Sequence, residues 1–192
     1  GSEFHVNSYE SSYQSDPSVT SLSDGGFVVT WQSNGQDGSY YGIYGQRFDS
    51  AGATVGGEFQ VSTYTTNGQQ IPSVTALNDG DFVVTWHSDG QDGSDYGIYG
   101  QRFDSAGATV GAEFQVSTYT TNGQHTPSIT ALNDGSFVVT WQSDGQDGSD
   151  YGIYGQRYDS AGAKVGATTY IDNFSVGSQE GYPEGVTFSA DG

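Results

Sequence analysis

The sequence predicts an all-β fold, a β-propeller-like array of four-stranded antiparallel blades. Three observations predict it. The chain repeats itself every 55 residues, each unit holds four short segments rich in β-branched and aromatic residues, and one Trp recurs in each full unit. Repeats of this length are typical of propellers, solenoids and arrays. Four antiparallel strands in each repeat favour propeller blades within that group.

The repeat is recognised from segments that recur with few changes. The segment that begins at Glu3 begins again at Glu58 and at Glu113, and a shorter variant begins at Thr168. We therefore expect about three and a half units. The expected divisions are a cloning scar (1–2), unit 1 (3–57), unit 2 (58–112), unit 3 (113–167) and a partial fourth unit (168–192).

Each unit is expected to form one small twisted sheet. In the second unit the strands are EFQVST, PSVTAL, DFVVTWHS and YGIYGQRFD, and the segments NDG and DSAG are tight-turn signals between strands. Because side chains alternate between the faces of a strand, Phe82, Val84 and Trp86 share one face. Val83 and Thr85 share the other. Both faces carry apolar side chains, so each sheet needs a neighbour on both sides.

The number of blades leaves several assemblies open. Propellers close with about four to eight blades, which is more than this chain supplies. Two chains could self-associate into a closed ring, or one chain could form an open arc. A four-bladed ring completed by the atypical end segment is a further alternative. Outside the propeller class, a string of separate small β-sandwiches would leave each unit with a very thin core.

The charge of the chain excludes one class of partner. The 192 residues include 23 acidic and 4 basic ones, for a net charge of −19. We predict no nucleic-acid binding, because phosphates need clustered Lys and Arg. We also predict no direct membrane insertion, because no apolar run is long enough for a span. Self-repulsion of this size is relieved by bound cations or by screening salt.

An acidic loop between the third and fourth strands of each unit is the candidate metal site. Its carboxylates are Asp89, Asp92 and Asp95 in the second unit, Asp144, Asp147 and Asp150 in the third, and Asp37 alone in the first. Calcium takes about six to eight oxygen ligands on a flexible loop, so these residues predict a calcium site. The alternative is that the Asp-Gly pairs only form turns, since they tolerate a positive φ.

A repeated aromatic set is the candidate ligand-binding surface. Its members are Trp31, Trp86, Trp141, Tyr44, Tyr99 and Tyr154. Aromatic rings close to carboxylates and amides suit sugars, whose CH faces stack on rings while their hydroxyls form hydrogen bonds. The alternative is that these rings form the core of the blades. Each unit also has one Arg, which we expect to bridge acidic turns rather than to bind a sugar or a carboxylate.

No group of residues predicts catalysis. The three His residues, His5, His87 and His125, occupy three different positions in the repeat. The chain has no Cys and a single Lys, which removes most covalent chemistry. We therefore predict that the protein is not an enzyme and has no catalytic residues.

The segments DGGFVVTWQS, DGQDGS, YGIYGQRFDSAG and GGEFQV resemble a known kind of tandem repeat. They are similar to repeats of very large, type I-secreted bacterial surface proteins of the hemolysin-type calcium-binding (RTX-like) adhesin group. The resemblance covers nearly all of positions 3–167 and implies a secreted module at the bacterial cell surface. The GGxGxDxUx nonapeptide of that group and the DxDxDG loop of integrin-like propellers are both missing, so neither calcium site carries over.

Together these features predict a non-enzymatic extracellular repeat module of a bacterial surface protein, which serves in adhesion or surface display. Calcium is the cofactor that could stabilise this module. Its expected partner is a glycan or another cell-surface ligand. The alternative function is that of a carbohydrate-binding, lectin-like propeller.

Overall fold

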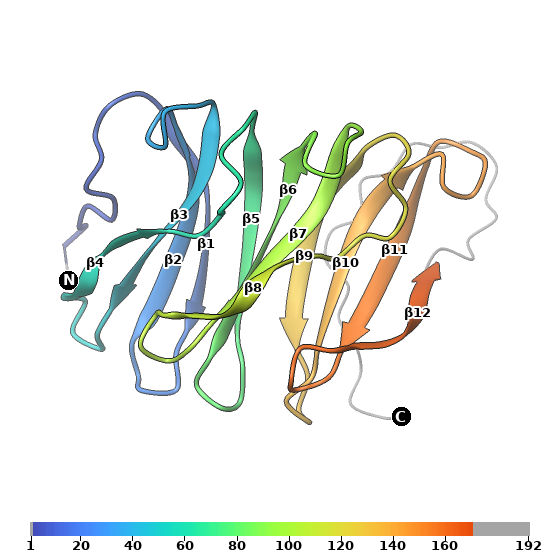
Figure 1. Ribbon diagram of the computed structural model, residues 1–192. Coiled ribbons are helices and arrows are strands. Elements are labelled where there is room, and N and C mark those ends of the chain that lie inside the picture. Colours follow the sequence, from blue (N-terminus) through green and yellow to red (C-terminus); the bar gives the residue numbers. More distant parts are fainter. Residues whose placement is uncertain (1, 171–192) are drawn as a thin grey trace.

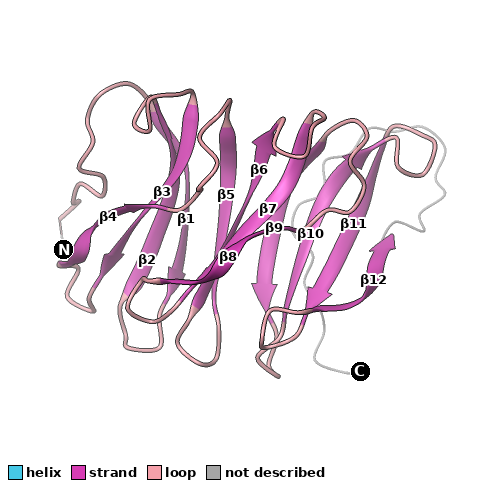
Figure 2. Cartoon of the chain, in the orientation of Figure 1, coloured by secondary structure: helices cyan, strands magenta, loops and turns pink. Residues whose placement is uncertain are grey.

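The structure, a computed structural model, describes residues 2–170 and places three four-stranded antiparallel sheets in them (Figures 1 and 2). The first sheet consists of β1 (Gln14–Ser21), β2 (Phe27–Asn34), β3 (Tyr41–Phe48) and β4 (Thr54–Gln60). The second consists of β5 (Gln69–Ala76), β6 (Phe82–Asp89), β7 (Tyr96–Phe103) and β8 (Thr109–Gln115). The third consists of β9 (Gln124–Ala131), β10 (Phe137–Asp144), β11 (Tyr151–Tyr158) and β12 (Lys164–Tyr170). None of the described residues forms a helix that could cross a membrane.

Strand order in each sheet follows the chain, so tight turns join neighbouring strands. In the second sheet the amide of Leu77 donates to the carbonyl of Asp81 at 2.7 Å, and the amide of Gly80 donates to Leu77 at 3.1 Å. Gly80 has a φ of 93°, which residues with a Cβ rarely adopt. The amide of Gly107 closes the next turn on the carbonyl of Asp104 at 2.9 Å. The predicted NDG and DSAG turns are therefore confirmed.

The four strands of each repeat are confirmed, but their grouping into sheets differs from the predicted one. The segment that begins at Glu58 was expected to open the second sheet. Instead it ends β4, which pairs with β3 of the first sheet. The tight turn after β3 brings the chain straight back alongside that strand, so the nearest free edge belongs to the preceding sheet. The predicted fourth unit (168–192) contributes only the end of β12, and from residue 171 onward it lies outside the described residues.

The three sheets stack face to face, with the second between the first and the third (Figure 1). On one face of the second sheet, Val84 and Trp86 belong to the same apolar cluster as Ile43 of the first sheet. On the other face, Val83 belongs to the same cluster as Trp141 of the third sheet. The prediction that both faces of a sheet are apolar and are buried by neighbouring sheets is confirmed for the second sheet, which has a neighbour on each side.

The first strand of each sheet also joins neighbouring sheets by hydrogen bonds. We call β1, β5 and β9 the linking strands. The amide of Val74 on β5 donates to Ser18 Oγ on β1 at 3.2 Å, and the amide of Ala76 donates to Thr20 Oγ1 at 3.4 Å. The same pair of bonds recurs between β9 and β5, at 3.3 Å each. These contacts set one register for sheet against sheet, which apolar packing alone does not define.

In residues 2–170 the sheets form an open array, with the first and third sheets on opposite sides of the second (Figure 1). The coarser part of the predicted fold is confirmed, namely repeated four-stranded antiparallel sheets in a propeller-like stack. A string of separate sandwiches is wrong, because each sheet shares its core with its neighbour. The two closed assemblies, a ring formed by two chains and a four-bladed ring formed by one chain, stay predictions.

Replacing Val84 with Ala should lower the free energy of unfolding by about 2 kcal/mol, because the side chain is fully buried between two sheets. The matched change Val110→Ala removes the same atoms from a 39 % exposed position on β8. It should change the free energy of unfolding by less than about 0.5 kcal/mol. Chemical denaturation of both variants measures the difference, and equal losses would contradict burial by stacking.

Candidate functional site

Polar side chains gather at the two ends of the stack. At one end, which we call the loop end, lie the acidic loops between the second and third strands of each sheet (35–40, 90–95 and 145–150). At the other end, which we call the turn end, lie the turns that join the first two strands and the last two strands. Because neighbouring strands are antiparallel and consecutive in sequence, successive connections fall at opposite ends (Figure 1).

The middle Asp of the second acidic loop is bonded to its surroundings within the sheet. Asp92 Oδ1 accepts the amide of Ser94 at 3.1 Å, and Oδ2 accepts Nε2 of Gln115 at 3.4 Å. The carboxylate also lies against Gly97, where an added Cβ would approach Oδ2 to 2.7 Å. The close approach of this carboxylate therefore explains why the first Gly of the YGIYG segment, Gly97, has no side chain. The Asp itself acts in forming the turn.

A glutamate on the last strand ties the acidic loop to the chain that enters the sheet. Glu113 of β8 accepts the amide of Thr63 at 2.7 Å and Nε2 of Gln91 at 2.5 Å. Glu58 of β4 makes the equivalent contacts in the first sheet. The loop and the entering segment are thus held together by the protein's own carboxylates.

The seven aspartates predicted to bind calcium do not converge on one point. They are Asp37, Asp89, Asp92, Asp95, Asp144, Asp147 and Asp150. Throughout residues 2–170, no three Asp, Glu or His side chains lie close enough to hold a metal ion. The middle carboxylate of each loop accepts an amide of its own loop instead. Calcium also takes backbone carbonyls and waters as ligands, so calcium binding stays a prediction of the sequence.

The six rings predicted to bind a ligand all lie in the core, which corrects that assignment. Trp31, Trp86, Trp141, Tyr44, Tyr99 and Tyr154 are at most 6 % exposed. A sugar cannot stack on a ring that a neighbouring segment or sheet already covers. Burial, followed by the nearby charges of Asp92 and Glu113, raises the pKa of Tyr99 to about 12. The phenol therefore stays protonated at any ordinary pH.

The sequence did not predict one cluster at the loop end, which lies between the second and third sheets. It contains His87 of β6, Tyr96 of β7 and His125 of β9. The ring centroid of Tyr96 is 4.6 Å from that of His87 and 5.1 Å from that of His125, and the two His centroids are 5.7 Å apart. His87 is only 5 % exposed, and neither of its ring nitrogens has a hydrogen-bond partner. Burial, followed by the charge of His125, lowers the pKa of His87 to about 3.

His87 replaces a residue that makes a hydrogen bond between the first two sheets. There the same repeat position is Gln32, whose Oε1 accepts the amide of Ile71 at 2.9 Å. Ile71 has a φ of 53° at a bulge in β5, an unfavourable conformation for a β-branched residue. The signal that could have found this cluster is a pair of His residues in consecutive units, but only the stacking shows that they meet.

Two exposed aromatic rings belong to the acidic loops and to the strand that follows them at the loop end. Tyr40 is 70 % exposed and Tyr151 is 60 % exposed. The ring centroid of Tyr151 is 6.0 Å from that of His125, so the open ring adjoins the buried cluster. Asp95 and Asp144 lie close enough to His125 to oppose the fall in its pKa that burial causes. This part of the surface therefore combines an exposed ring with acidic groups.

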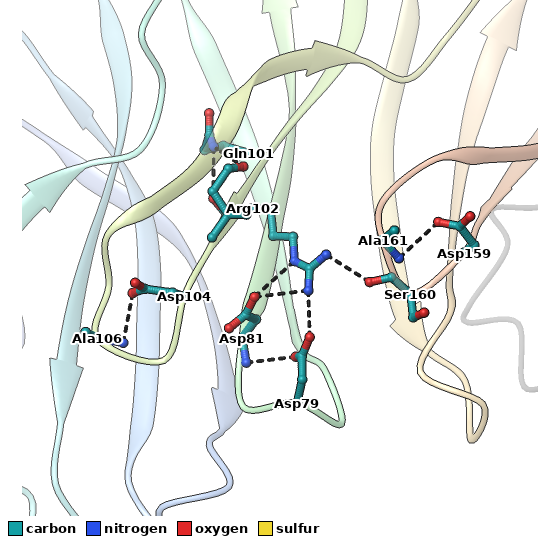
Figure 3. A network of polar contacts seen from close by, with 10 residues as sticks. Asp79, Asp81, Gln101, Arg102, Asp104, Ala106, Asp159, Ser160 and Ala161 are labelled. Carbon is teal, nitrogen blue, oxygen red and sulfur yellow. Dashed lines mark hydrogen bonds and ion pairs between the residues drawn. The ribbon is translucent and has the colours of Figure 1, made fainter.

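The turn end is held by the repeated arginines, as Figure 3 shows for the second sheet. Arg102 Nη2 lies 2.6 Å from Asp79 Oδ2 and 3.0 Å from Asp81 Oδ2. Its Nη1 donates to the carbonyl of Ser160 in the third sheet at 2.9 Å. Arg47 and Arg157 pair with the matching aspartates of their own sheets. Each Arg therefore pairs with one acidic turn of its own sheet, and Arg102 also links two sheets.

Comparison with known proteins identifies a fold but no family. No protein-family model matches the sequence, and no curated protein matches it. A protein of unknown function from Dyadobacter fermentans DSM 18053 has a TM-score of 0.59 at 11 % identity, over 83 % of this chain and 56 % of that one. A thermostable family-43 glycoside hydrolase has a TM-score of 0.55 at 13 % identity, over 88 % and 63 %. The endo-arabinase from Bacteroides thetaiotaomicron VPI-5482 has a TM-score of 0.51 at 17 % identity, over 82 % and 61 %.

This chain thus spans less than two thirds of the length of each of these three structures. At these identities the likeness shows the fold alone. The fold is β-propeller-like, a class that includes the two glycoside hydrolases.

The histidine cluster predicts a pH dependence of stability. His87 is uncharged in the folded protein down to a pH of about 3, whereas in the unfolded chain it gains a proton below about pH 6.5. The free energy of unfolding should therefore fall as the pH is lowered from about 6.5 towards 3, because the unfolded state binds the extra proton. Tyr96 and Gln70 flank His87 within the second sheet, and His125 faces it from the third.

The variant His87→Gln should weaken that dependence and stabilise the protein at acid pH, since Gln accepts an amide at this position between the first two sheets. The control His5→Gln replaces a His whose side chain is 63 % exposed and should leave the dependence unchanged. Thermal melts of the parent and both variants across this pH range provide the test. An unchanged acid dependence in His87→Gln would contradict the assignment.

Proposed function

We propose that this chain is a non-enzymatic repeat module of an extracellular bacterial protein and serves in adhesion or surface display. One observation carries the proposal: side chains that recur in the units are used to hold the array together. The repeated Trp residues are buried between sheets or beneath the segment that precedes β1, and the repeated Arg residues pair with turn carboxylates. Repetition therefore supports a mechanical role for these groups rather than a role in bond breaking.

The loop end is the surface that we propose for contact with a partner. The three acidic loops have the same backbone bonding, so each sheet presents a similar loop on the same side of the stack. Packed sheets lie about 10 Å apart, so such loops recur at a short and regular spacing. A regular row of weak contacts suits a repetitive partner such as a surface polymer, because linked contacts add avidity.

The ligand class that we propose for the loop end is carbohydrate. Support comes from the exposed ring of Tyr151, which adjoins His125 beside the carboxylates of Asp95 and Asp144. A sugar offers a CH face to a ring and hydroxyls to carboxylates, which matches this mixture. The buried Trp and Tyr rings take no part in this proposal.

A glycan array followed by titration of any saccharide that binds provides the test. Tyr151→Ser should reduce the affinity by about tenfold, which corresponds to the loss of one stacking contact. Tyr13→Ser is the control, since Tyr13 is 76 % exposed and lies beside β2 of the first sheet, where its carbonyl accepts the amide of Asn34. An array without hits would remove the carbohydrate ligand and leave surface display, and release of reducing sugar from a bound polysaccharide would contradict the non-enzymatic proposal.

Calcium stabilisation is tested separately. If the acidic loops bind calcium, adding calcium should raise the melting temperature more than adding the same ionic strength of a sodium salt, because screening alone acts through ionic strength. The double variant Asp92→Asn and Asp147→Asn should then lose the excess. Equal effects of the two salts in the parent protein would show that the loops only form turns.

A further inference from the structure

The two end sheets of the stack each have one face that packs against no other sheet in residues 2–170. We call the face of the first sheet that contains Val29 and Trp31 the leading face. We call the face of the third sheet that contains Val138 and Ile153 the trailing face. Both are repeat copies of faces that do pack together inside the chain.

The internal contacts show how a leading face and a trailing face fit. In the second sheet, the counterparts of Val29 and Trp31 are Val84 and Trp86, and both are fully buried against the first sheet. The face that receives them carries Ile43, the counterpart of Ile153. The same arrangement recurs one sheet further along the stack. The chain therefore contains two examples of this contact.

The leading face of the first sheet is incompletely covered. Val19 on β1 is 64 % exposed, whereas its counterparts Val74 and Ile129 are 7 % and 8 % exposed. Beside Trp31 there is a hollow of about 180 Å³, lined in part by Pro17. The segment that precedes β1 covers the rest of the face, as Val6 packs into the cluster of Trp31. The corresponding face of the second sheet packs against the first sheet, whereas no sheet in residues 2–170 packs against the leading face.

The trailing face of the third sheet is incompletely covered in a complementary way. Val138 and Ile153 are half-buried, whereas their counterparts in the second sheet, Val83 and Ile98, are fully buried. The side chain of Arg157 is 47 % exposed, against 13 % for its counterpart Arg102. Arg102 donates to a turn carbonyl of the next sheet, and Arg157 has no following sheet in the described chain.

The residues that make the polar contacts between sheets have counterparts at these two faces. On β1 and β5, two hydroxyls accept amides of the next linking strand. On β9 the matching hydroxyls belong to Ser128 and Thr130, and both residues are exposed. Gln142 is the counterpart of Gln32, which accepts an amide from the next sheet. The trailing face therefore offers both the apolar surface and the acceptors that the leading face fits.

We propose that two copies of this chain associate head to tail, the trailing face of each covering the leading face of the other. In this contact Val19 is buried, and Ser128 and Thr130 accept amides of β1 from the second copy. Gln142 accepts the amide of Asp16, at the position of Ile71, and Arg157 donates to the carbonyl of Ser50, at the position of Ser160. Residues 2–170 of each copy contribute three sheets, so two copies bring six sheets together, within the range of about four to eight blades that propellers use.

The charge of the chain predicts how this association responds to salt. Each copy carries a net charge of −19, so bringing two copies together is opposed by repulsion. Salt screens that repulsion but does not weaken apolar packing. The dimer should therefore form more readily as the salt concentration rises, which is the opposite of an interface held by ion pairs.

Sedimentation equilibrium of the full chain over a range of protein and salt concentrations measures the association. We expect a species of twice the chain mass of 20.3 kDa. Val19→Asp should weaken the association by more than about tenfold, because it buries an unpaired carboxylate. Val110→Asp adds the same charge at an exposed position on β8 and should leave the association unchanged.

A mixing experiment separates a head-to-tail contact from a symmetric one. Val19→Asp damages only the leading face, and Thr130→Asp damages only the trailing face. Each variant alone should be monomeric, but an equimolar mixture keeps one intact contact and should form a dimer. The near-UV circular dichroism of each variant should match that of the parent, which shows that the stack itself is folded.

Three results would overturn the proposal. A parent chain that stays monomeric at every salt concentration rules out the contact. A mixture of the two variants that fails to pair while the parent dimerises indicates a symmetric interface. A series of species that grows with protein concentration shows that the contact does not close into a ring.

Discussion

The structure depends on one interaction, the packing of the Trp-bearing face of one sheet against the Ile-bearing face of the sheet before it. A four-stranded sheet of this size has two apolar faces and no interior of its own. Its stability therefore comes from neighbouring sheets. The middle sheet has two neighbours and contains the largest number of fully buried side chains, among them Trp86 and Phe82. The order of the sheets, the position of the loops and the exposure of the ends all follow from that contact.

Polar groups add direction and register to this packing. Hydroxyls on the linking strands accept amides from the next sheet, and Arg102 reaches a turn of the next sheet. These bonds run from one sheet to the next in a single sense, so the stack has a head and a tail. The substitution of His87 at the position of Gln32 makes the second contact chemically different from the first, although the backbone is the same.

The distribution of chemistry over the molecule bears on its function. Carboxylates give the chain its large negative charge, and several of them, such as Asp92, Glu113 and Asp79, hold a turn, a loop or an arginine. The exposed rings of Tyr40 and Tyr151 lie at the loop end, away from the arginines at the turn end. The two ends of the array thus differ in chemistry, and the display function proposed above uses the loop end.

The sequence by itself determined the strands, the turns and the need for stacking, because alternation of apolar residues and Asp-Gly turns are local properties of the chain. It also determined that the aspartates form turns and that each Arg pairs with a turn carboxylate, because these contacts lie within one sheet. Only the tertiary structure decided which strands share a sheet, since the pairing of β4 with β3 depends on where the chain returns in space. It also placed the repeated Trp and Tyr rings in the core and brought His87 to His125, because both results come from contact between sheets or with the segment that precedes β1.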